Sequence, residues 1–402
     1  MNIKTKLENN TLTVFLNERI DTLNAADTEH DIFAAVNENS KCSLLIDASD
    51  LKYISSAGLR IFMKLRQQTG KPVTVCEVSP EVYNIFETTG FTELLDVRKR
   101  LREVSIESLP FIGAGANGSV YRLDRETIIK VYNPLTNPPE KIMREKQSAM
   151  QAFIHGIPSA ISFDIVRAGD RLGLIYEMID AVTLGSSINE APDTACDCGT
   201  KMAELLLKLH STEFESGSLP DARINLQLWA DVAEKSGFYE ADTITKLRRL
   251  IDSIPSRSTF IHGDFHPGNI MVKDGEWILI DMGDASVGHP ICDLIGAFQI
   301  MKLVSQNTGP GAMRYTGMPA ALLSRVWNAF EKRYFGTENP AQLEKINGLL
   351  RYYSLIRSLA GVTFSEAVPP EKRPELTQRM QSYFLDAYDK YGLSLLDGSE
   401  FR

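Results

Sequence analysis

The chain has 402 residues and a formal net charge of −9, with 43% hydrophobic and 24% charged residues. This is a globular composition, which excludes disordered and collagen-like proteins, and the length suffices for two or three domains. The acidic balance argues against nucleic acid as a partner, and the sequence lacks the long apolar run of a membrane span. Five cysteines, an odd number, are typical of a reducing compartment, so we expect a cytoplasmic protein without a signal peptide.

We expect two domains, residues 1–105 and 106–402, joined by the charge-rich stretch 97–105. The first domain alternates short apolar strands with amphipathic segments of helical period. The expected strands are 12–16, 42–47 and 72–76, and the expected helices are 22–36, a segment around 59–65 marked by Leu59, Phe62 and Leu65, and 80–89. This alternation predicts an α/β fold with an open sheet and helical crossovers.

The segment 47–60, DASDLKYISSAGLR, resembles the strand–turn–helix signature of STAS domains, the fold of anti-sigma-factor antagonists. The stretches 77–83 and 89–95 are similar to the closing pattern of the same family. In that family a serine at the helix start accepts phosphate, and the matching residue here is Ser56. The resemblance implies a regulatory or docking module that binds a protein partner.

Two interpretations of Ser56 stay open. A phosphoserine would add nearly two negative charges at a helix N-terminus, where the free amides and the helix dipole favour them. Alternatively, Ser55 or Ser56 only caps the helix, which stabilises it by about 1 kcal/mol. Ser55 stands where the family often has aspartate.

The second domain opens with a glycine-rich segment in which Gly113, Gly115 and Gly118 form G-x-G-x-x-G. A dinucleotide site would need a helix directly after the glycines. Residues 119–132 instead predict strand–turn–strand, because they are rich in β-branched and aromatic residues. This pattern is typical of kinases, in which the loop amides lie over the phosphates of ATP, and Lys130 occupies the position of the strand lysine that contacts the phosphates.

A lysine in this position needs a carboxylate to hold it. The helix expected at about 139–153 offers Glu140 and Glu145, and we prefer Glu145 because Glu140 in the first turn is explained by the helix dipole. The strand 172–179 would lead into the hinge between two lobes, so we assign Glu177 and Ile179 to ATP binding as well.

Polar residues at kinase-like spacing follow in the segments 260–272 and 277–284. Asp264 and Asn269 are five residues apart, as in the kinase catalytic loop, and an apolar strand ends at Asp281. Asn269 and Asp281 carry the hard oxygen ligands that Mg²⁺ prefers. We expect Asp264 to accept the proton of the acceptor hydroxyl, so Asp264 is the predicted catalytic residue.

The segment HGDFHPGN at 262–269, followed by 288–295, resembles the aminoglycoside phosphotransferase and choline kinase group of protein-kinase-like enzymes. The resemblance implies an α+β, two-lobed fold, with an N-lobe at about 106–178, a helical C-lobe at about 179–402 and ATP between them. It also implies that His262 and Asp293 support the catalytic loop. His266 either helps to position the acceptor or packs the loop, and we favour packing. Asp284 is either a further acid near the metal or a solvated strand end.

Three functions remain open. The first is an ATP- and Mg²⁺-dependent phosphotransferase for a hydroxyl of a small molecule, with the first domain as a regulatory module. The second is a signalling kinase that phosphorylates Ser56 of its own or a neighbouring copy, and the third is a non-catalytic ATP sensor. The second domain carries a net charge of −7 (30 basic and 37 acidic residues), which would suit a cationic acceptor such as an aminoglycoside or amino alcohol.

Overall fold

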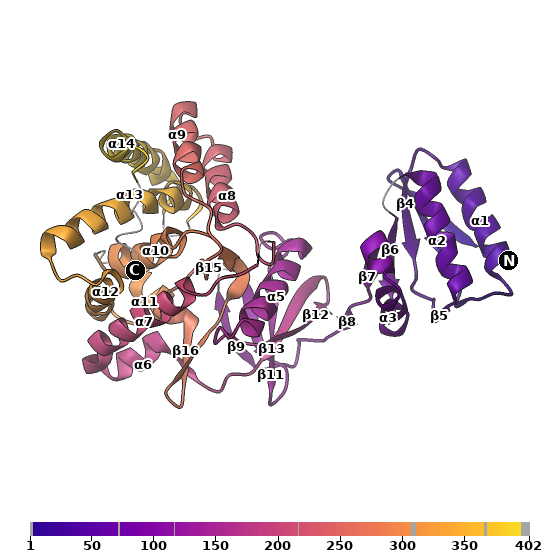
Figure 1. Ribbon diagram of the computed structural model, residues 1–402, viewed down its shortest axis with the longest axis horizontal. Helices are drawn as coiled ribbons and strands as arrows, with labels where there is room; N and C mark the ends of the chain where they lie inside the picture. Colours follow the sequence, from indigo (N-terminus) through magenta and orange to yellow (C-terminus); the bar gives the residue numbers. More distant parts are fainter. Residues whose placement is uncertain are drawn as a thin grey trace. The chain divides into compact units, whose positions relative to one another are not determined.

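The computed structural model describes residues 3–70, 73–115, 117–215, 217–306, 311–365 and 368–394. The chain forms two compact units, Met1–Val104 and Ser105–Arg402, each of which buries its own hydrophobic core (Figure 1). No helix among the described residues has both the length and the apolar character that crossing a membrane requires.

The first unit is built on a five-stranded sheet in the order β1-β2-β4-β6-β7. Only β1 runs antiparallel to its neighbour, and the other pairs are parallel. The strands are β1 (Lys4–Glu8), β2 (Thr11–Phe15), β4 (Ser43–Asp47), β6 (Thr74–Val78) and β7 (Asp96–Lys99), with β3 (Arg19–Ile20) and β5 (Tyr53–Ile54) forming a separate pair. The helices are α1 (Ala25–Glu38), α2 (Ser56–Thr69), α3 (Pro80–Thr88) and α4 (Phe91–Leu94).

Alternation along β2 explains how this sheet forms its core, because Leu12 and Val14 are buried while their neighbours are not. The predicted apolar face of α2 is confirmed, since Leu59, Phe62 and Leu65 are all buried. The expected joint at 97–105 is partly wrong. Its first residues belong to β7, which pairs with β6, and a second short strand, β8 (Arg102–Glu103), lies within it.

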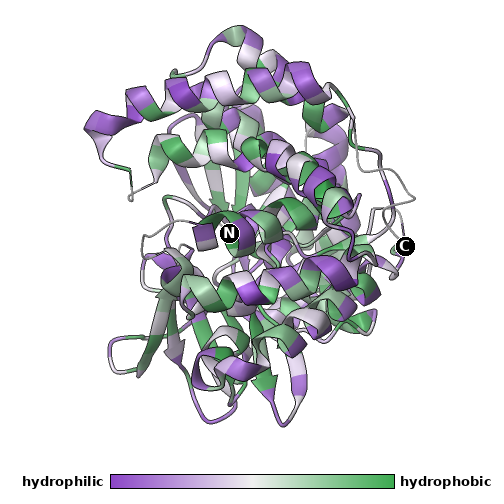
Figure 2. Cartoon of the chain, turned by 90° about the vertical axis from the view of Figure 1, so that its left-hand side faces the viewer, coloured by the Kyte–Doolittle hydropathy of each residue, from purple (hydrophilic) through white to green (hydrophobic). Residues whose placement is uncertain are grey.

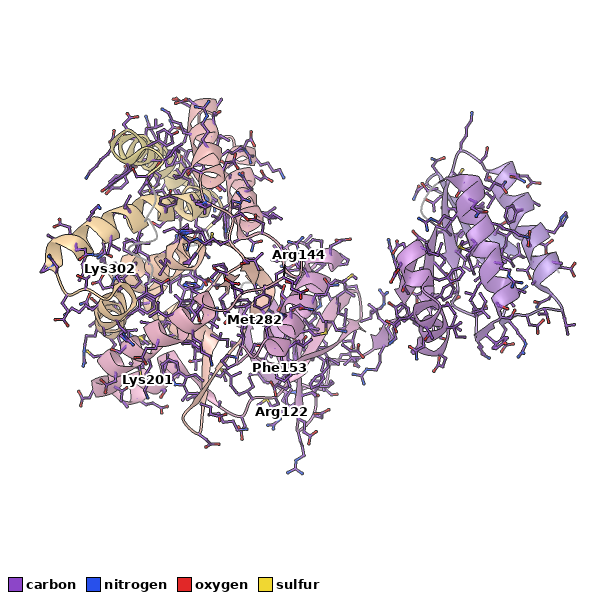
Figure 3. All side chains as sticks on the ribbon, viewed as in Figure 1. Arg122, Arg144, Phe153, Lys201, Met282 and Lys302 are labelled. Carbon is purple, nitrogen blue, oxygen red and sulfur yellow. The ribbon has the colours of Figure 1, made fainter. Side chains whose placement is uncertain are left out.

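The second unit begins with an antiparallel sheet in which five strands follow the order β12-β13-β11-β10-β9. These strands are β9 (Phe111–Gly115), β10 (Gly118–Arg122), β11 (Thr127–Tyr132), β12 (Ser162–Ala168) and β13 (Arg171–Glu177). The helix α5 (Pro139–Ile154) connects β11 to β12 and packs against η3 (Met282–Asp284). Figure 3 labels Met282 of η3 beside Arg144 and Phe153 of α5.

The rest of the second unit is mainly helical. Its helices are α6 (Leu184–Glu190), η1 (Pro192–Thr194), α7 (Ala195–His210), α8 (Ala222–Lys235), α9 (Ala241–Asp252), α10 (Ile291–Ala297), η4 (Phe298–Leu303), η5 (Val304–Gln306), α11 (Gly311–Thr316), α12 (Ala320–Phe335), α13 (Pro340–Phe364), η6 (Pro370–Lys372) and α14 (Arg373–Tyr391). Helices such as α7 and α9 bury one apolar face, whereas α10 is buried along its whole length. Figure 2 shows hydrophilic and hydrophobic residues alternating along the helices of the chain. Together the helices bury one common core.

Short strands flank the polar residues that the sequence singles out in this helical part. They are β14 (Val182–Thr183), β16 (Ile270–Lys273) and β17 (Glu276–Leu279), which form one sheet, and β15 (Phe260–Ile261) and β18 (Ser286–Val287), which form a pair. The turn η2 (Pro267–Asn269) lies between β15 and β16, and η3 follows β17. The bends between these strands therefore position the residues that the sequence singles out.

Candidate functional site

Lys130 connects three elements that are far apart in the sequence. Its Nζ donates hydrogen bonds to Oε1 of Glu145 in α5 and to Oδ1 of Asp281 before η3, each at 2.8 Å. Lys130 alternates on β11 with the buried Ile129 and Val131, so its side chain leaves the sheet on the opposite face from theirs. The structure therefore brings together Lys130, Glu145 and Asp281, as the sequence predicted.

The environment of Lys130 keeps it charged. Burial alone would lower its pKa, but the carboxylates of Asp281 and Glu145 outweigh that effect and raise the pKa well above its ordinary value. Glu145 is 2% exposed and also accepts a hydrogen bond of 2.7 Å from the hydroxyl of Tyr176. Glu140 is exposed in the first turn of α5, so Glu145 is the helix carboxylate that reaches the lysine.

Asp281 adopts a backbone conformation that aspartate rarely takes. Its φ is 62° and its ψ is 64°, in the left-handed region. Gly283 follows closely, and a Cβ at that position would lie 3.1 Å from Oε2 of Glu145. The tight turn after β17 thus brings the Asp281 carboxylate back to Lys130 while leaving room for Glu145.

The three predicted loop glycines differ in what surrounds them. They belong to the β9–β10 hairpin, in which Gly115 pairs with Gly118. A Cβ on Gly118 would lie 2.1 Å from the carbonyl oxygen of Val131, so the neighbouring strand requires glycine there. A Cβ on Gly113 or Gly115 would meet no described atom within 4 Å. Packing therefore explains Gly118, whereas Gly113 and Gly115 leave open space at the hairpin. Ala116, between them, lies outside the described residues.

Glu177 and Ile179 lie at the end of β13, where the small sheet continues into the helical part. Oε1 of Glu177 accepts a hydrogen bond of 2.8 Å from the amide of Ile161, so its side chain is engaged within the sheet. A contact of Glu177 with a nucleotide would therefore come from its main chain. Ile179 is half-buried, and its amide donates to no acceptor within the described part of the chain.

Residues 262–269, which we call the catalytic loop, place Asn269 against Asp264. Nδ2 of Asn269 donates to the carbonyl oxygen of Asp264 at 2.9 Å and to its Oδ2 at 3.2 Å. These bonds occupy the amide nitrogen of Asn269 and leave its amide oxygen, the atom that a metal would bind. Among the described residues, no group of three or more His, Cys, Asp or Glu side chains is arranged to hold a metal ion.

Asp293 in α10 hydrogen-bonds to the main chain of this loop. It is fully buried, and its carboxylate accepts hydrogen bonds from the amides of His262 (3.0 Å) and Gly263 (2.6 Å) and contacts Nε2 of His210 at 3.0 Å. His262 is also buried, and its Nδ1 accepts a hydrogen bond of 3.3 Å from the amide of Asp264. Both residues therefore hydrogen-bond to the main chain of the loop, as expected for the supporting role that the resemblance implies.

Asp264 has basic neighbours that the sequence does not place beside it. Nε2 of His266 lies 3.5 Å from its Oδ2, and Nη2 of Arg357 lies 3.4 Å from its Oδ1. Burial would raise the pKa of Asp264, but His266, Arg357 and His262 together hold that pKa well below the ordinary range. Packing is thus an incomplete interpretation of His266, because its ring contacts the predicted base.

Asp284 belongs to the same cluster of acids. Burial and the nearby charge of Asp264 raise the pKa of Asp284, with a smaller contribution from Asp281, while Arg357 opposes them. Asp284 is half-buried in η3, and its Cβ lies 2.6 Å from the position that a Cβ on Gly263 of the catalytic loop would take.

Arg357 is the site residue that sequence analysis did not find. It lies on α13, 93 residues after Asp264, in the part of the chain for which the sequence predicts a helical C-lobe without naming individual site residues. A Cβ on Gly296 would lie 2.5 Å from Nη1 of Arg357, so this glycine of α10 makes room for the guanidinium. Gly296 is the one residue that could have indicated a close approach to α10, and nothing in the sequence connects it to Arg357.

In the first unit, the structure separates the roles of the two serines before α2. Ser55 is the N-cap, and its hydroxyl accepts a hydrogen bond of 3.4 Å from the amide of Gly58. Ser56 is exposed at the first helical position. The capping role thus belongs to Ser55, and the hydroxyl of Ser56 is open to solvent.

Comparison with known proteins agrees with both resemblances. The chain belongs to the phosphotransferase enzyme family, whose sequence model matches residues 108–330, and it is therefore an enzyme that transfers phosphate to hydroxyl groups. Residues 2–104 match the STAS domain. In this region the chain is 35% identical over 82 residues, 19% of this chain and 69% of the relative, to a protein of Bordetella bronchiseptica assigned as the anti-sigma factor antagonist BtrV.

Among solved structures, the chain is similar to ADP-bound aminoglycoside phosphotransferase APH(2'')-Ib, at 14% identity, 76% coverage of this chain, 97% coverage of that chain and a TM-score of 0.44. A choline/ethanolamine kinase family protein from Mesorhizobium loti has 13% identity, coverage of 71% and 90%, and a TM-score of 0.43. A protein of Thermotoga maritima assigned as an anti-sigma factor antagonist covers 24% of this chain and 86% of its own, with 14% identity and a TM-score of 0.23.

Proposed function

We propose that the second unit transfers the γ-phosphate of ATP, bound with Mg²⁺, to a hydroxyl of a small molecule, and that the STAS domain regulates it or docks a protein partner. One observation carries the proposal: Lys130 joins Glu145 and Asp281 by hydrogen bonds of 2.8 Å beside a glycine hairpin. In protein kinases a lysine–glutamate pair and a metal-binding aspartate must be in place together for phosphoryl transfer.

The residues present fit ATP and Mg²⁺. Gly113 and Gly115 leave space over the hairpin that any larger side chain would fill, which suits a phosphate chain lying on backbone amides. Asn269 and Asp281 would hold Mg²⁺, because this ion commonly uses one or two protein oxygens together with substrate phosphates. When bound, the metal would neutralise charge on the phosphates.

The remaining site residues bind, orient and move a proton. Lys130, fixed by Glu145, supplies a positive charge for the phosphates, and the amide of Ile179 offers a donor for the base of the nucleotide. Asp264 accepts the proton of the acceptor hydroxyl, and its low pKa keeps the carboxylate ionised at neutral pH. Asp293 orients the loop through the amides of His262 and Gly263.

A second candidate acceptor is Ser56, because its hydroxyl is exposed and the helix cap is made by Ser55 instead. Phosphate at this position would lie at the N-terminus of α2, where the helix dipole favours negative charge. The third hypothesis, a non-catalytic sensor, is the least supported, because a sensor has no need of a held proton acceptor such as Asp264.

Two measurements on the full chain separate these functions. After incubation with Mg²⁺ and ATP, intact mass should show no added phosphate if the acceptor is a small molecule. One added phosphate that disappears in Ser56→Ala would support the signalling kinase. ADP release should then rise with particular hydroxyl compounds from a panel of sugars, hydroxy acids, amino alcohols and aminoglycosides. ATP binding with neither phosphorylation nor stimulated ADP release would contradict both transferase functions and favour the sensor.

A further inference from the structure

Arg357 has more hydrogen-bond donors than the protein uses. Its side chain is 17% exposed, yet its one hydrogen bond to a described residue is the 3.4 Å contact with Asp264. A guanidinium has five N–H donors. The other donors are accessible to solvent, because none of the Arg357 nitrogens is among the fully buried unpaired atoms of the described residues.

Two other arginines in the same unit have more hydrogen-bond partners than Arg357. Arg223 is 33% exposed and makes several contacts with both carboxylate oxygens of Asp221. Arg248 is 32% exposed and contacts Gln227, Asp231 and Glu234. Arg357 is more buried than either arginine and has fewer partners, although a buried charge without partners is costly.

Helix packing places Arg357 next to Asp264, the predicted base. α13 packs against α8 and α10 (Figure 1). Gly296 in α10 allows Nη1 of the arginine to approach, and the same glycine lies 3.6 Å, measured from an added Cβ, from the carbonyl oxygen of Gly263 in the catalytic loop. The guanidinium therefore sits next to the predicted base, on the helical part of the second unit.

An apolar flank adjoins this cation. The Cζ atom of Arg357 lies 5.4 Å from the ring centroid of Trp229 in α8. Trp229 in turn stacks on Phe364 at the end of α13, with ring centroids 6.0 Å apart, and Phe364 is 52% exposed. A ligand near Asp264 would thus meet a guanidinium with unused donors and two partly exposed aromatic rings.

We propose that Arg357 binds an anionic group, a carboxylate or a phosphate, of the acceptor, so that the acceptor is a hydroxyl compound that carries a negative charge. This inference rests on the proposed function and names the substrate class of the same site. Arginine binds carboxylate and phosphate in the same forked geometry. The overall acidity of the second domain suggests a cationic acceptor, but local charge beside the reacting hydroxyl decides recognition, because distant surface charges are screened.

The test uses the full chain with Mg²⁺ and ATP and matched pairs of acceptors that differ in charge. The pairs are glycerate with glycerol and homoserine with 3-amino-1-propanol, with choline and kanamycin as cationic compounds and glycerol phosphate as a phosphate-bearing one. We expect phosphorylation of an anionic member, with a KM about 10- to 100-fold higher in Arg357→Met, as for loss of a hydrogen bond to a charged group. Arg357→Lys should restore part of this loss. Arg248→Met is the control that leaves KM unchanged.

The affinity for Mg-ATP distinguishes a failure of the inference about Arg357 from a failure of the proposed function. Its affinity should change little in Arg357→Met, because the arginine contacts the acceptor. If the wild type binds Mg-ATP and phosphorylates a neutral or cationic acceptor in preference to every anionic one, the inference is wrong and the proposed function stands. An unchanged KM in Arg357→Met also overturns the inference. A chain that does not bind Mg-ATP at all would overturn the proposed function and this inference with it.

Discussion

Asp264 shows how neighbours prepare one residue for catalysis. Its carboxylate is held by Asn269, His266 and Arg357, and its pKa is well below the ordinary value. A depressed pKa in the folded state means that ionised Asp264 stabilises the protein above the unfolded pKa of about 4, and that this stability is lost as the pH falls further. The base is therefore ionised throughout the neutral range.

Replacing Asp264 by asparagine should slow turnover by about 10²- to 10⁴-fold, the usual contribution of a positioned base. Asparagine keeps the size and the hydrogen-bonding oxygen of the side chain, so the affinity for Mg-ATP should stay close to that of the wild type. Steady-state ADP release with a productive acceptor and direct ATP titration measure the two effects. A variant that turns over as fast as the wild type would remove Asp264 from the mechanism.

The polar residues of the site differ in how far the sequence could predict them. Lys130, Asp264, Asn269 and Asp281 could be found, because phosphoryl transfer fixes their types, order and spacing. Arg357 could not be found, because it reaches Asp264 only through tertiary packing, and a single arginine on a long helix is usually a solvent-exposed surface residue. The contact between His266 and Asp264 was missed because loop geometry does not follow from spacing.

At the scale of elements, the start of α2 separates capping from modification. Ser55→Ala should lower the free energy of unfolding of the first unit by about 0.5–2 kcal/mol, because the amide of Gly58 loses its acceptor. Ser56→Ala should change it by less than about 0.5 kcal/mol, as for an exposed residue without a special role. Chemical denaturation followed by circular dichroism compares the two variants. Equal losses would contradict the assignment of the cap to Ser55.

The β9–β10 hairpin separates packing from ligand binding in the same way. Gly118→Ala should destabilise the second unit by about 1–3 kcal/mol, because its Cβ would meet the carbonyl oxygen of Val131. Gly113→Ala should leave the thermal midpoint nearly unchanged and weaken ATP binding. Calorimetry and ATP titration on both variants test this contrast. Tight ATP binding by Gly113→Ala would argue against a nucleotide on this hairpin.

Elements with strong periodicity could be predicted, and elements without it could not. The strand β11 buries Ile129, Val131 and Tyr132, and the helix α5 begins at the expected Pro139 and ends one residue beyond the expected range. The strand β1 was missed because all five of its residues are exposed, so no alternating burial marks it. The sequence pattern of β7 resembles that of a joint because its residues are mostly charged and exposed. The start of the strand predicted at 72–76 lies outside the described residues.

At the scale of the whole molecule, one buried histidine should make stability depend on pH. Burial, followed by the charges of Arg257 and His210, lowers the pKa of His289 to about 4. The unfolded chain binds a proton at about pH 6.5, so stability is complete above this value and is lost as the pH falls toward 4. Between pH 7 and 4.5 we expect a loss of about 2 kcal/mol from this residue.

The variant His289→Asn tests this expectation, because asparagine can still accept the hydrogen bond from the amide of Ile291 but does not titrate. Unfolding of the second unit should depend less on pH in the variant than in the wild type. An identical fall in stability between pH 7 and 4.5 would assign the effect to other groups.

The chain divides into two units, each with its own core, so the residues of the proposed phosphoryl-transfer site can be assembled by one unit alone. Asp281 and Lys130, 151 residues apart, meet within the second unit alone. Nucleotide binding should therefore raise the temperature at which the second unit unfolds.

Titration calorimetry of ATP into the full chain tests the central claim most directly. We predict binding that requires Mg²⁺ and is weakened at least tenfold in Asp281→Asn, a variant that keeps the left-handed backbone because asparagine tolerates it. Equal ATP affinity with and without Mg²⁺, and in wild type and variant, would contradict the assignment of the metal–nucleotide site to Lys130, Asn269 and Asp281.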